Sequence, residues 1–175
     1  MEIDRALRSA DDRSALRSGD EALDRFFHRY AGQNQFRHHL GVTYVAEEGG
    51  RIFAYATVAP RHLEIDDLPE KVRRRLPRYP VPVRGLARLA VGQGAQASGL
   101  GRELLRFVFG LAVRMADEVG CAGVVVDAKP GAIEFYAKYG FVAFEPLEGQ
   151  SEARPRTTAM WLPIQTIRAA MVREN

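Results

Sequence analysis

A strand, a loop of small residues and a long amphipathic helix follow one another in the middle of this chain, and they restrict its fold more than any other feature. Residues 84–91 form the expected strand, residues 92–99 the loop and residues 100–120 the helix, whose apolar side chains repeat with helical spacing. A buried strand is predicted next, at residues 122–127. Because a strand–helix–strand unit closes right-handed, the two strands are expected to lie parallel. The pattern therefore predicts an α/β fold.

The flanking segments predict a mixed, mostly antiparallel sheet with helices around it. Upstream, Ser18 and Glu21 have the spacing of a capping box, which indicates the start of a helix. Two strands joined by a Glu-Glu-Gly-Gly turn indicate an antiparallel hairpin. Downstream, a second crossover helix ends at Gly140, which is placed as its C′ residue. The predicted helices are 20–38, 68–76, 130–139 and 164–173, and the other strands are 42–46, 51–59, 141–144 and 157–162, with a polar loop at 145–156.

Length and composition indicate one compact domain, residues 1–175. The chain is 46% hydrophobic and 27% charged, which is typical of a globular protein. A domain of this size buries about 70% of its unfolded surface without a metal or disulfide. Cys121 is the single cysteine, which excludes disulfide frameworks and multi-cysteine zinc sites, and no apolar stretch approaches the roughly 20 residues that span a bilayer. We expect a soluble, cytoplasmic protein, with residues 1–19 as an N-terminal extension of unassigned fold and a C-terminal helix within 163–175.

The central loop has the chemistry of an anion-binding site. Glycines let the backbone approach an anion closely, and the first turn of the following helix offers N–H groups without intrahelical partners. Pyrophosphate is the expected ligand. A P-loop is disfavoured because Gly101 is followed by Arg102 and Glu103 instead of Lys and Ser or Thr. A Rossmann fingerprint through residues 92–97 is a weaker alternative, since Asp127 then lies about 30 residues downstream where about 20 is expected.

Two segments resemble motifs of one enzyme family, the GNAT (Gcn5-related) N-acetyltransferases. Residues 96–101, QASGLG, resemble the family's acetyl-CoA loop, Arg/Gln-x-x-Gly-x-Gly/Ala, and lie between a strand and a long helix as they do there. Residues 135–141, FYAKYGF, are similar to the family's Phe-Tyr…Gly-Phe segment and follow about 35 residues later. The resemblance covers residues 23–162. It implies a GNAT-like mixed, mostly antiparallel sheet flanked by helices, with a parallel, splayed strand pair at the acetyl-CoA site.

The resemblance also implies a reaction, the direct transfer of an acetyl group from acetyl-CoA, the co-substrate, to a primary amine. It further implies which residues take part. The central strand and loop would hold acetyl-CoA and polarise its thioester carbonyl. Tyr136 would be the general acid for the departing thiolate, because a phenol with an ordinary pKa of about 10 stays protonated at neutral pH. No general base is visible in the sequence. The expected acetyl-CoA-binding residues are Leu89, Ala90, Val91, Gln96, Ala97, Ser98, Gly99, Leu100, Gly101 and Arg102.

A narrower resemblance concerns the acceptor. Residues 76–83, LPRYPVPV, and 87–91, ARLAV, are similar to the toxins of this family that acetylate aminoacyl-tRNA, although Gly92 stands where those toxins commonly have an acid. The resemblance implies aminoacyl-tRNA as acceptor, an antitoxin partner and a homodimer. Residues 71–102 carry eight cations and no acid. This positive charge could bind a polyanion, could bind the phosphates of CoA, or could be a solvated basic face without a ligand. The candidate substrate contacts are Arg73, Arg74, Arg75, Arg78 and Arg88, the last with a structural ion pair as its alternative.

The remaining reactive residue types indicate no further chemistry. The four histidines have no recognised metal-ligand spacing, so no metal site is predicted. Cys121 is expected to be inert packing, and Tyr139 to pack rather than react. Two other functions stay open on the same fold. One is an ordinary small-molecule or protein N-acetyltransferase, and the other is a non-catalytic CoA- or RNA-binding module.

Overall fold

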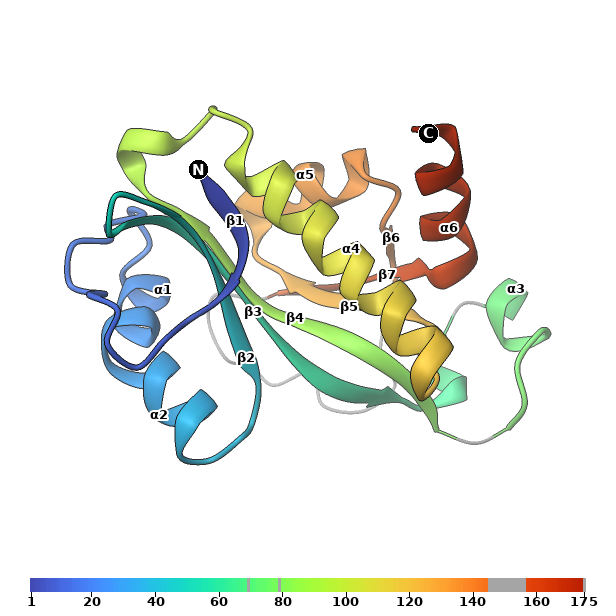
Figure 1. The fold of residues 1–175 in the computed structure, drawn as a ribbon. Helices are drawn as coiled ribbons and strands as arrows, with labels where there is room; N and C mark the ends of the chain where they lie inside the picture. Colours follow the sequence, from blue (N-terminus) through green and yellow to red (C-terminus); the bar gives the residue numbers. More distant parts are fainter. Residues whose placement is uncertain (69, 79, 145–156, 175) are drawn as a thin grey trace. The chain divides into compact units, whose positions relative to one another are not determined.

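A computed structural model describes residues 1–68, 70–78, 80–144 and 157–174 (Figure 1). Its strands and helices are interspersed along the chain. In order they are β1 (Glu2–Ala6), α1 (Glu21–Arg25), the π-helical turn η1 (Phe26–Tyr30), α2 (Ala31–Phe36), β2 (Val42–Glu48), β3 (Arg51–Leu63), η2 (Ile65–Asp67), α3 (Glu70–Arg73), β4 (Val81–Val91), η3 (Gln93–Ala95), α4 (Leu100–Glu118), β5 (Gly123–Ala128), η4 (Pro130–Ala132), α5 (Ile133–Lys138), β6 (Val142–Ala143), β7 (Thr158–Pro163) and α6 (Ile164–Arg173).

The strands form one mixed sheet in the order β1-β2-β3-β4-β5-β7-β6. β4 and β5 are the parallel pair in a sheet that is mostly antiparallel, which confirms the predicted fold class. The chain forms two compact units, Met1–Ala59 with Leu86–Gly110, and Pro60–Gly85 with Leu111–Asn175. Since β3, β4 and α4 each contribute residues to both units, the units are interleaved in sequence.

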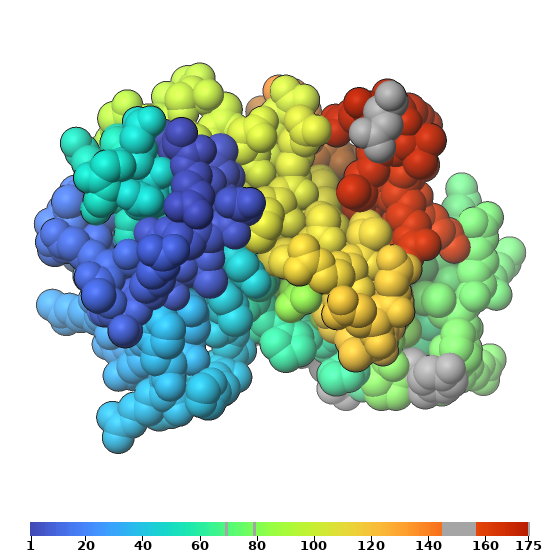
Figure 2. Space-filling model, in the orientation of Figure 1, coloured from blue at the N-terminus to red at the C-terminus, as the bar shows by residue number. Residues whose placement is uncertain are grey.

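The first unit begins with a strand that the sequence did not predict. β1 pairs antiparallel with β2, with Glu2 opposite Glu47, and Figure 2 shows β1 (dark blue) at the surface beside the β2–β3 turn (teal). The buried side chain of β1 is Arg5, which is only 8% exposed. Its guanidinium donates to both carboxylate oxygens of Asp11, at 2.8 and 3.2 Å. A half-buried strand is recognised in sequence by apolar residues at alternate positions, and here the buried position is a charged arginine. The segment was therefore not predicted as a strand.

The first helical segment starts at a different cap from the one predicted. The Asp20 side chain accepts hydrogen bonds from the N–H groups of Ala22 and Leu23, so Asp20 is the N-cap. Ser18, the predicted cap, instead donates its hydroxyl to the Asp24 carboxylate at 2.6 Å. The capping-box assignment was therefore wrong by two residues, whereas the predicted helix itself is confirmed as α1, η1 and α2.

The π-helical turn η1 places two consecutive aromatic side chains in the core of the first unit. Phe26 and Phe27 are both buried, and the ring of Tyr55 from β3 stacks on Phe27 with a centroid distance of 4.4 Å. The Tyr55 hydroxyl donates to the carbonyl oxygen of Leu23 at 2.7 Å. Single π-helical turns are rare and frequently occur at functional sites. The other members of this core are Leu7, Leu16, Ala31, Val45, Ile52 and Ala90.

The second unit is built on the antiparallel pair β5 and β7, to which β6 adds a short edge strand. Gly123 lies under the ring of Trp161, because a Cβ at residue 123 would be 2.7 Å from the indole Cη2. The N–H of Ala122, just before β5, donates to the carbonyl oxygen of Pro82 in β4 at 2.8 Å. The buried members of this core are Leu63, Leu68, Val81, Val83, Val125, Phe144, Ala159 and Trp161.

Most predicted elements are confirmed with shifted ends. The central strand starts three residues earlier than predicted, at Val81, and α6 has the predicted bounds. The basic helix is shorter than predicted, because the N–H groups of residues 75 and 76 bond to carbonyl oxygens three residues back instead of the four residues back of an α-helix. The polar loop predicted at 145–156 lies outside the described residues. Within the described part of the chain, no helix is both long and apolar enough to cross a membrane.

Candidate active site

The segment between β4 and α4 carries the predicted anion-binding motif. After η3 the chain turns through two residues with positive φ, Ala97 at 62° and Gly99 at 90°. A positive φ at a residue such as alanine costs about 1–2 kcal/mol and is kept only where the surroundings enforce it. A Cβ at Gly99 would meet no atom within 4 Å. The backbone conformation rather than crowding therefore requires glycine at residue 99.

Hydrogen bonds from the first turn of the loop hold it in place. The Gln96 side-chain Nε2 donates to the carbonyl oxygens of Val91 and Ser18, at 3.1 and 2.7 Å. The backbone N–H of Gln93 donates to the carbonyl oxygen of Arg17 at 2.7 Å. Residues 17 and 18 belong to the N-terminal segment that sequence analysis left unassigned. That segment supports the loop, a role for which the sequence carried no signal.

The start of α4 leaves backbone donors available to an anion. The first backbone bond from the loop into this helix runs from the N–H of Glu103 to the carbonyl oxygen of Gly99, at 3.1 Å. The N–H groups of residues 100–102 precede it, and the first turn of an α-helix has no intrahelical acceptors for them. The macrodipole of this 19-residue helix adds positive potential at the same end. The open glycine and these donors fit a pyrophosphate group.

The predicted acetyl-CoA residues all belong to the first unit and lie on one continuous stretch. Ala90 is buried in the core of that unit, and its neighbours Leu89 and Val91 are half-buried. Successive side chains of a strand point to opposite faces, so Leu89 and Val91 share the face that Ala90 does not occupy. Arg88 is on the same face as Ala90, toward η1.

Arg88 is a half-buried cation with an aromatic partner and, among the described residues, no carboxylate partner. Its guanidinium carbon lies 3.7 Å from the centroid of the Phe26 ring, a close cation–π contact. Burial lowers the pKa of Arg88, and the neighbouring Tyr55 acts in the opposite direction. Among the described residues Arg88 makes no hydrogen bond or ion pair, so they do not provide the structural ion pair considered as the alternative. An arginine in these surroundings remains charged at neutral pH.

Arg88 lines a cavity of about 100 Å³ within the first unit. Phe26 and Leu40 contribute apolar walls, and the side chains of Thr43 and Thr57 lie on another side. The two threonine hydroxyls share a buried hydrogen bond of 2.7 Å. The cavity combines a fixed cation with hydroxyl and apolar surface, which suits a small group with an anionic or carbonyl oxygen.

In the second unit, a helix-ending motif fixes the position of Tyr136. Gly140 has a φ of 97°, and its N–H donates to the carbonyl oxygen of Ala137 at 3.0 Å. The N–H of Phe141 reaches back to the carbonyl oxygen of Tyr136 at 3.3 Å. These are the two bonds of a Schellman motif, in which the side chains of Phe141 and Tyr136 are expected to touch. Their ring centroids are 5.4 Å apart, so the predicted C′ role of Gly140 is confirmed.

The Tyr136 side chain is buried, and its hydroxyl has no acceptor among the described residues. The residue is 5% exposed, and the Phe135 ring packs edge-on against it at 5.2 Å. Burial raises the pKa of Tyr136 well above that of an ordinary phenol. Its hydroxyl makes no hydrogen bond to the described residues, and it is not among the polar atoms sealed from solvent. The phenol therefore stays protonated, and its hydroxyl donates no hydrogen bond to the described residues.

The basic segment around α3, residues 71–78, is partly neutralised by acids that precede it. Arg74 pairs with Glu70 at 2.6 Å, and Arg73 lies 4.0 Å from Asp66. The other two predicted contacts of this segment have no ion pair within the described part of the chain. Exposed pairs of this kind are worth about 0–1 kcal/mol, so a polyanion can compete for these arginines. The eight-cation count overlooked these acids because they lie just upstream of it.

The remaining candidates have structural contacts. Tyr139 packs edge-on against Phe135 with a centroid distance of 5.1 Å, as predicted. Cys121 is a buried free cysteine whose thiol contacts the carbonyl oxygen of Gly123 at 3.2 Å. Asp127, the acid of the Rossmann alternative, pairs with Arg61 at 3.0 Å. Across the residues described, no group of three His, Cys, Asp or Glu side chains could hold a metal ion.

Comparison with known proteins identifies a family and a group of relatives. Residues 39–143 match the acetyltransferase (GNAT) domain, a span that includes the loop and Tyr136. A tRNA-acetylating toxin of Mycobacterium tuberculosis (strain ATCC 25618 / H37Rv) is 35% identical over 140 residues, which cover 78% of this chain and 82% of that protein. The match to the loop and tyrosine motifs thus extends to most of the chain.

Solved structures share the fold over nearly the whole chain. AtaT complexed with acetyl-methionyl-tRNAfMet has a TM-score of 0.81 at 24% identity, covering 95% of this chain and 97% of that one. A mutant AtaT toxin bound to the C-terminus of the antitoxin AtaR and acetyl-CoA has a TM-score of 0.76 at 22% identity, with 96% of each chain covered. At these identities the likeness shows a common fold.

Proposed function

This chain belongs to the GNAT acetyltransferase family, and from that premise we propose that it transfers the acetyl group of acetyl-CoA to the amino group of an aminoacyl-tRNA. It is an N-acetyltransferase that uses acetyl-CoA as co-substrate. The observation that carries the choice of acceptor is the 35% identity to a tRNA-acetylating toxin over most of both chains. Arg88, a cation without a carboxylate partner among the described residues, supports it.

We assign the holding of acetyl-CoA to the first unit. The loop glycine with positive φ and the free N–H groups at the start of α4 fit the pyrophosphate, and Gln96 keeps the loop in that shape. Backbone groups of residues 89–91 are assigned to the pantetheine arm. Acetyl-CoA supplies an acetyl group already activated as a thioester. The chain's part is therefore to orient the reactants and to stabilise charge as it develops.

We assign proton donation to Tyr136. A thiol with a pKa of about 8.5 is a stronger acid than an ordinary phenol at about 10, so complete transfer costs about 2 kcal/mol before burial is counted. Burial raises the pKa of Tyr136 further and increases this cost. The phenol then acts mainly by donating a hydrogen bond to the sulfur as negative charge builds there. Its hydroxyl suits this task because no acceptor among the described residues competes for it.

The acceptor side is assigned to the cavity at Arg88 and to the basic segment around α3. A guanidinium held on the Phe26 ring can bind an anionic or carbonyl oxygen of the acceptor without first breaking an ion pair. The basic segment would supply phosphate contacts through Arg73, Arg74, Arg75 and Arg78. No described residue stands out as a general base, and an amine can lose its proton to water before it attacks.

The proposal extends to partners and place of action. The relatives named as toxins and the AtaT structure with AtaR support an antitoxin protein as a partner of this chain. A homodimer and a cytoplasmic location, where acetyl-CoA and charged tRNA occur together, complete the proposal. Each is tested separately from the chemistry, by co-expression, by sizing and by fractionation.

The deciding experiment offers labelled acetyl-CoA to bulk charged tRNA and, separately, to deacylated tRNA. Label on the charged pool alone, sensitive to mild alkaline hydrolysis of the aminoacyl ester, is the expected result. Label on small amines or proteins with none on tRNA would make the chain an ordinary N-acetyltransferase. Absence of turnover with every acceptor, together with retained CoA binding, would make it a non-catalytic binding module.

The basic segment has its own test, because RNA phosphate contacts depend on salt. Each phosphate neutralised contributes a slope of about 0.9 or less to the fall of log K with log salt. Replacing Arg73, Arg74 and Arg75 with alanine is expected to reduce the slope for tRNA and to leave CoA affinity unchanged. An unchanged slope would show that the segment is a solvated face.

A further inference from the structure

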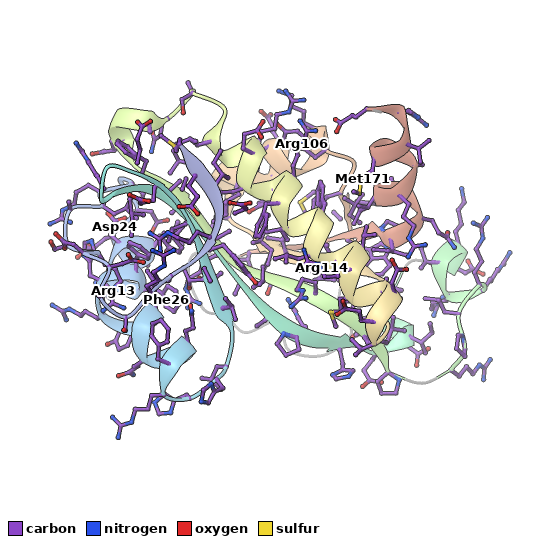
Figure 3. All side chains as sticks on the ribbon, in the orientation of Figure 1. Arg13, Asp24, Phe26, Arg106, Arg114 and Met171 are labelled. Carbon is purple, nitrogen blue, oxygen red and sulfur yellow. The ribbon has the colours of Figure 1, made fainter. Side chains whose placement is uncertain are left out.

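A second cationic surface lies in the first unit, whereas the basic segment that the sequence singled out belongs to the second unit. It is a groove of about 450 Å³ on the exposed side of α1 and η1. Arg25 and Arg29 line it from the helical segment, and Arg17 and Gln93 line it from the N-terminal segment and the loop. Gly19, Glu21, Asp24 and His28 complete the lining, and Figure 3 labels Asp24.

The acids of the groove are already occupied within the chain. The Asp24 carboxylate accepts bonds from the backbone N–H and the hydroxyl of Ser18, at 3.0 and 2.6 Å. Glu21 is 3.4 Å from Arg25, an exposed pair of small energy. Arg29 makes no hydrogen bond or ion pair among the described residues. The bonds from Ser18 leave the charge of Asp24 in place, so the lining has three guanidiniums against two carboxylates and a net positive charge.

The arginines are arranged at a cost to folding. Arg25 and Arg29 are one helical turn apart on the same face, where like charges repel by about 0.2–0.5 kcal/mol. Arg17 points its guanidinium at the carbonyl oxygens of Ser14 and Leu16, at 2.7 and 2.9 Å, and these fix its position without neutralising its charge. Three arginines that line one groove, with Arg17 fixed by backbone carbonyl oxygens, favour an oxyanion ligand, because the planar guanidinium matches phosphate oxygens.

The groove is tied to the acetyl-CoA loop. Gln93 lines the groove, and its N–H donates to the carbonyl oxygen of Arg17. Gly19, with a φ of 92°, lies so close to the Gln93 side chain that a Cβ there would be 2.9 Å from Nε2. An anion in the groove thus sits beside the segment that supports the loop. A polyanionic acceptor that delivers its amine to the acetyl group would bring phosphates near this surface.

We propose that the groove formed by Arg17, Arg25 and Arg29 binds backbone phosphates of the acceptor RNA. The inference rests on the proposed function for the identity of the acceptor, and it adds a binding surface that neither the motifs nor the basic segment indicated. The groove exceeds the size of a single phosphate group, which suits a stretch of RNA backbone. A free phosphate source on the same residues, the 3′-phosphate of CoA, is the alternative that the test separates.

The test measures binding of deacylated bulk tRNA and of CoA to the full-length chain. The variant is Arg25→Gln with Arg29→Gln, and the matched control is Arg37→Gln with Arg51→Gln, which removes two exposed arginines of the same unit outside the groove. Loss of two phosphate contacts is expected to lower the salt slope by about 1.8 and to weaken tRNA binding by up to about 30-fold at 0.15 M salt. CoA affinity is expected to stay within twofold, and the control is expected to change neither.

Each other outcome overturns the proposal. Loss of CoA affinity with an unchanged tRNA slope would assign the groove to CoA, and no change in either would make it a solvated surface. A second variant, Arg29→Glu, is expected to fold normally, because this exposed side chain makes no hydrogen bond or ion pair with the described residues. If Arg29→Glu leaves tRNA binding intact, the groove is not an RNA site. Because deacylated tRNA is not a substrate, these results do not depend on whether the chain acetylates aminoacyl-tRNA.

Discussion

Gly99 gives the sharpest test of how the chain holds acetyl-CoA. Its φ of 90° and the open space around its Cα allow the charge of a new side chain to be separated from its bulk. Asparagine and aspartate have nearly the same size, and both tolerate positive φ better than other residues. Gly99→Asn therefore measures strain and bulk alone, whereas Gly99→Asp adds a negative charge where the pyrophosphate is expected.

The magnitude of the charge effect follows from Coulomb's law. At a separation of about 5 Å and an effective dielectric constant of about 20–40, one carboxylate repels one phosphate charge by roughly 2–3 kcal/mol. This corresponds to about a 30- to 200-fold weaker affinity for CoA in Gly99→Asp than in Gly99→Asn. The backbone strain common to both variants, about 1 kcal/mol, cancels in that comparison. Higher salt is expected to narrow the difference.

Titration calorimetry with CoA, at two salt concentrations, measures these affinities directly. Thermal melting of both variants checks that the fold survives, as expected for a residue whose Cβ meets no neighbour. Gly94→Asp is a control for charge on the same loop, because Gly94 also has open space but lies in η3. Equal CoA affinities for Gly99→Asp and Gly99→Asn would refute a pyrophosphate at this turn.

Three further predictions concern the tyrosine, its cap and the N-terminal strand. Tyr136→Phe is expected to lower kcat by about 10²-fold and to spare CoA affinity and the melting temperature, since the hydroxyl has no bond among the described residues; an unaffected kcat would make Tyr136 structural. Gly140→Ala is expected to cost about 1–2 kcal/mol, through its positive φ and a Cβ 3.3 Å from Leu162 Cδ1, which calorimetry would record as a melting temperature about 2–8 °C lower. Burial raises the pKa of Asp11, but hydrogen bonds from Arg5 and the backbone outweigh this, and the pKa is lower than in the unfolded chain. The folded state then binds fewer protons, so this stabilisation is complete above about pH 4 and is lost as pH falls further; an Asp11→Asn variant with the same acid dependence of unfolding free energy would contradict the assignment.

The predicted fold agreed with the structure in those elements whose position follows from the local sequence pattern. The helix from Leu100, the return strand and the cap at Gly140 follow from periodicity and from the conformational freedom of glycine. The strand β1 could not be found in this way, because its buried position is occupied by Arg5 and its partner carboxylate lies six residues away. Only a folded chain shows that this arginine is neutralised.

The candidate site was predictable to the extent that it depends on backbone chemistry. The loop, the helix start and Tyr136 could be proposed as the site because glycine and tyrosine stand in characteristic spacings. The contacts of Arg88 were not predictable, since its partner Phe26, in the π-helical turn η1, is 62 positions away in the sequence. The groove beside α1 was missed for a related reason: its arginines are dispersed in sequence and interleaved with acids, so no charge run marks them.

The N-terminal segment links these observations. The family match begins at residue 39, so the segment before it would pass for an addition to the enzyme. Yet its strand β1 pairs with β2, and Arg5 lies 3.8 Å from Glu47 of that strand. The carbonyl oxygens of Arg17 and Ser18 also accept bonds from the loop. Breaking the pairing of β1 with β2 would therefore act on the loop as well as on stability. A loop with strained φ angles at residues 97 and 99 needs such support, because its conformation persists only while the surrounding bonds enforce it.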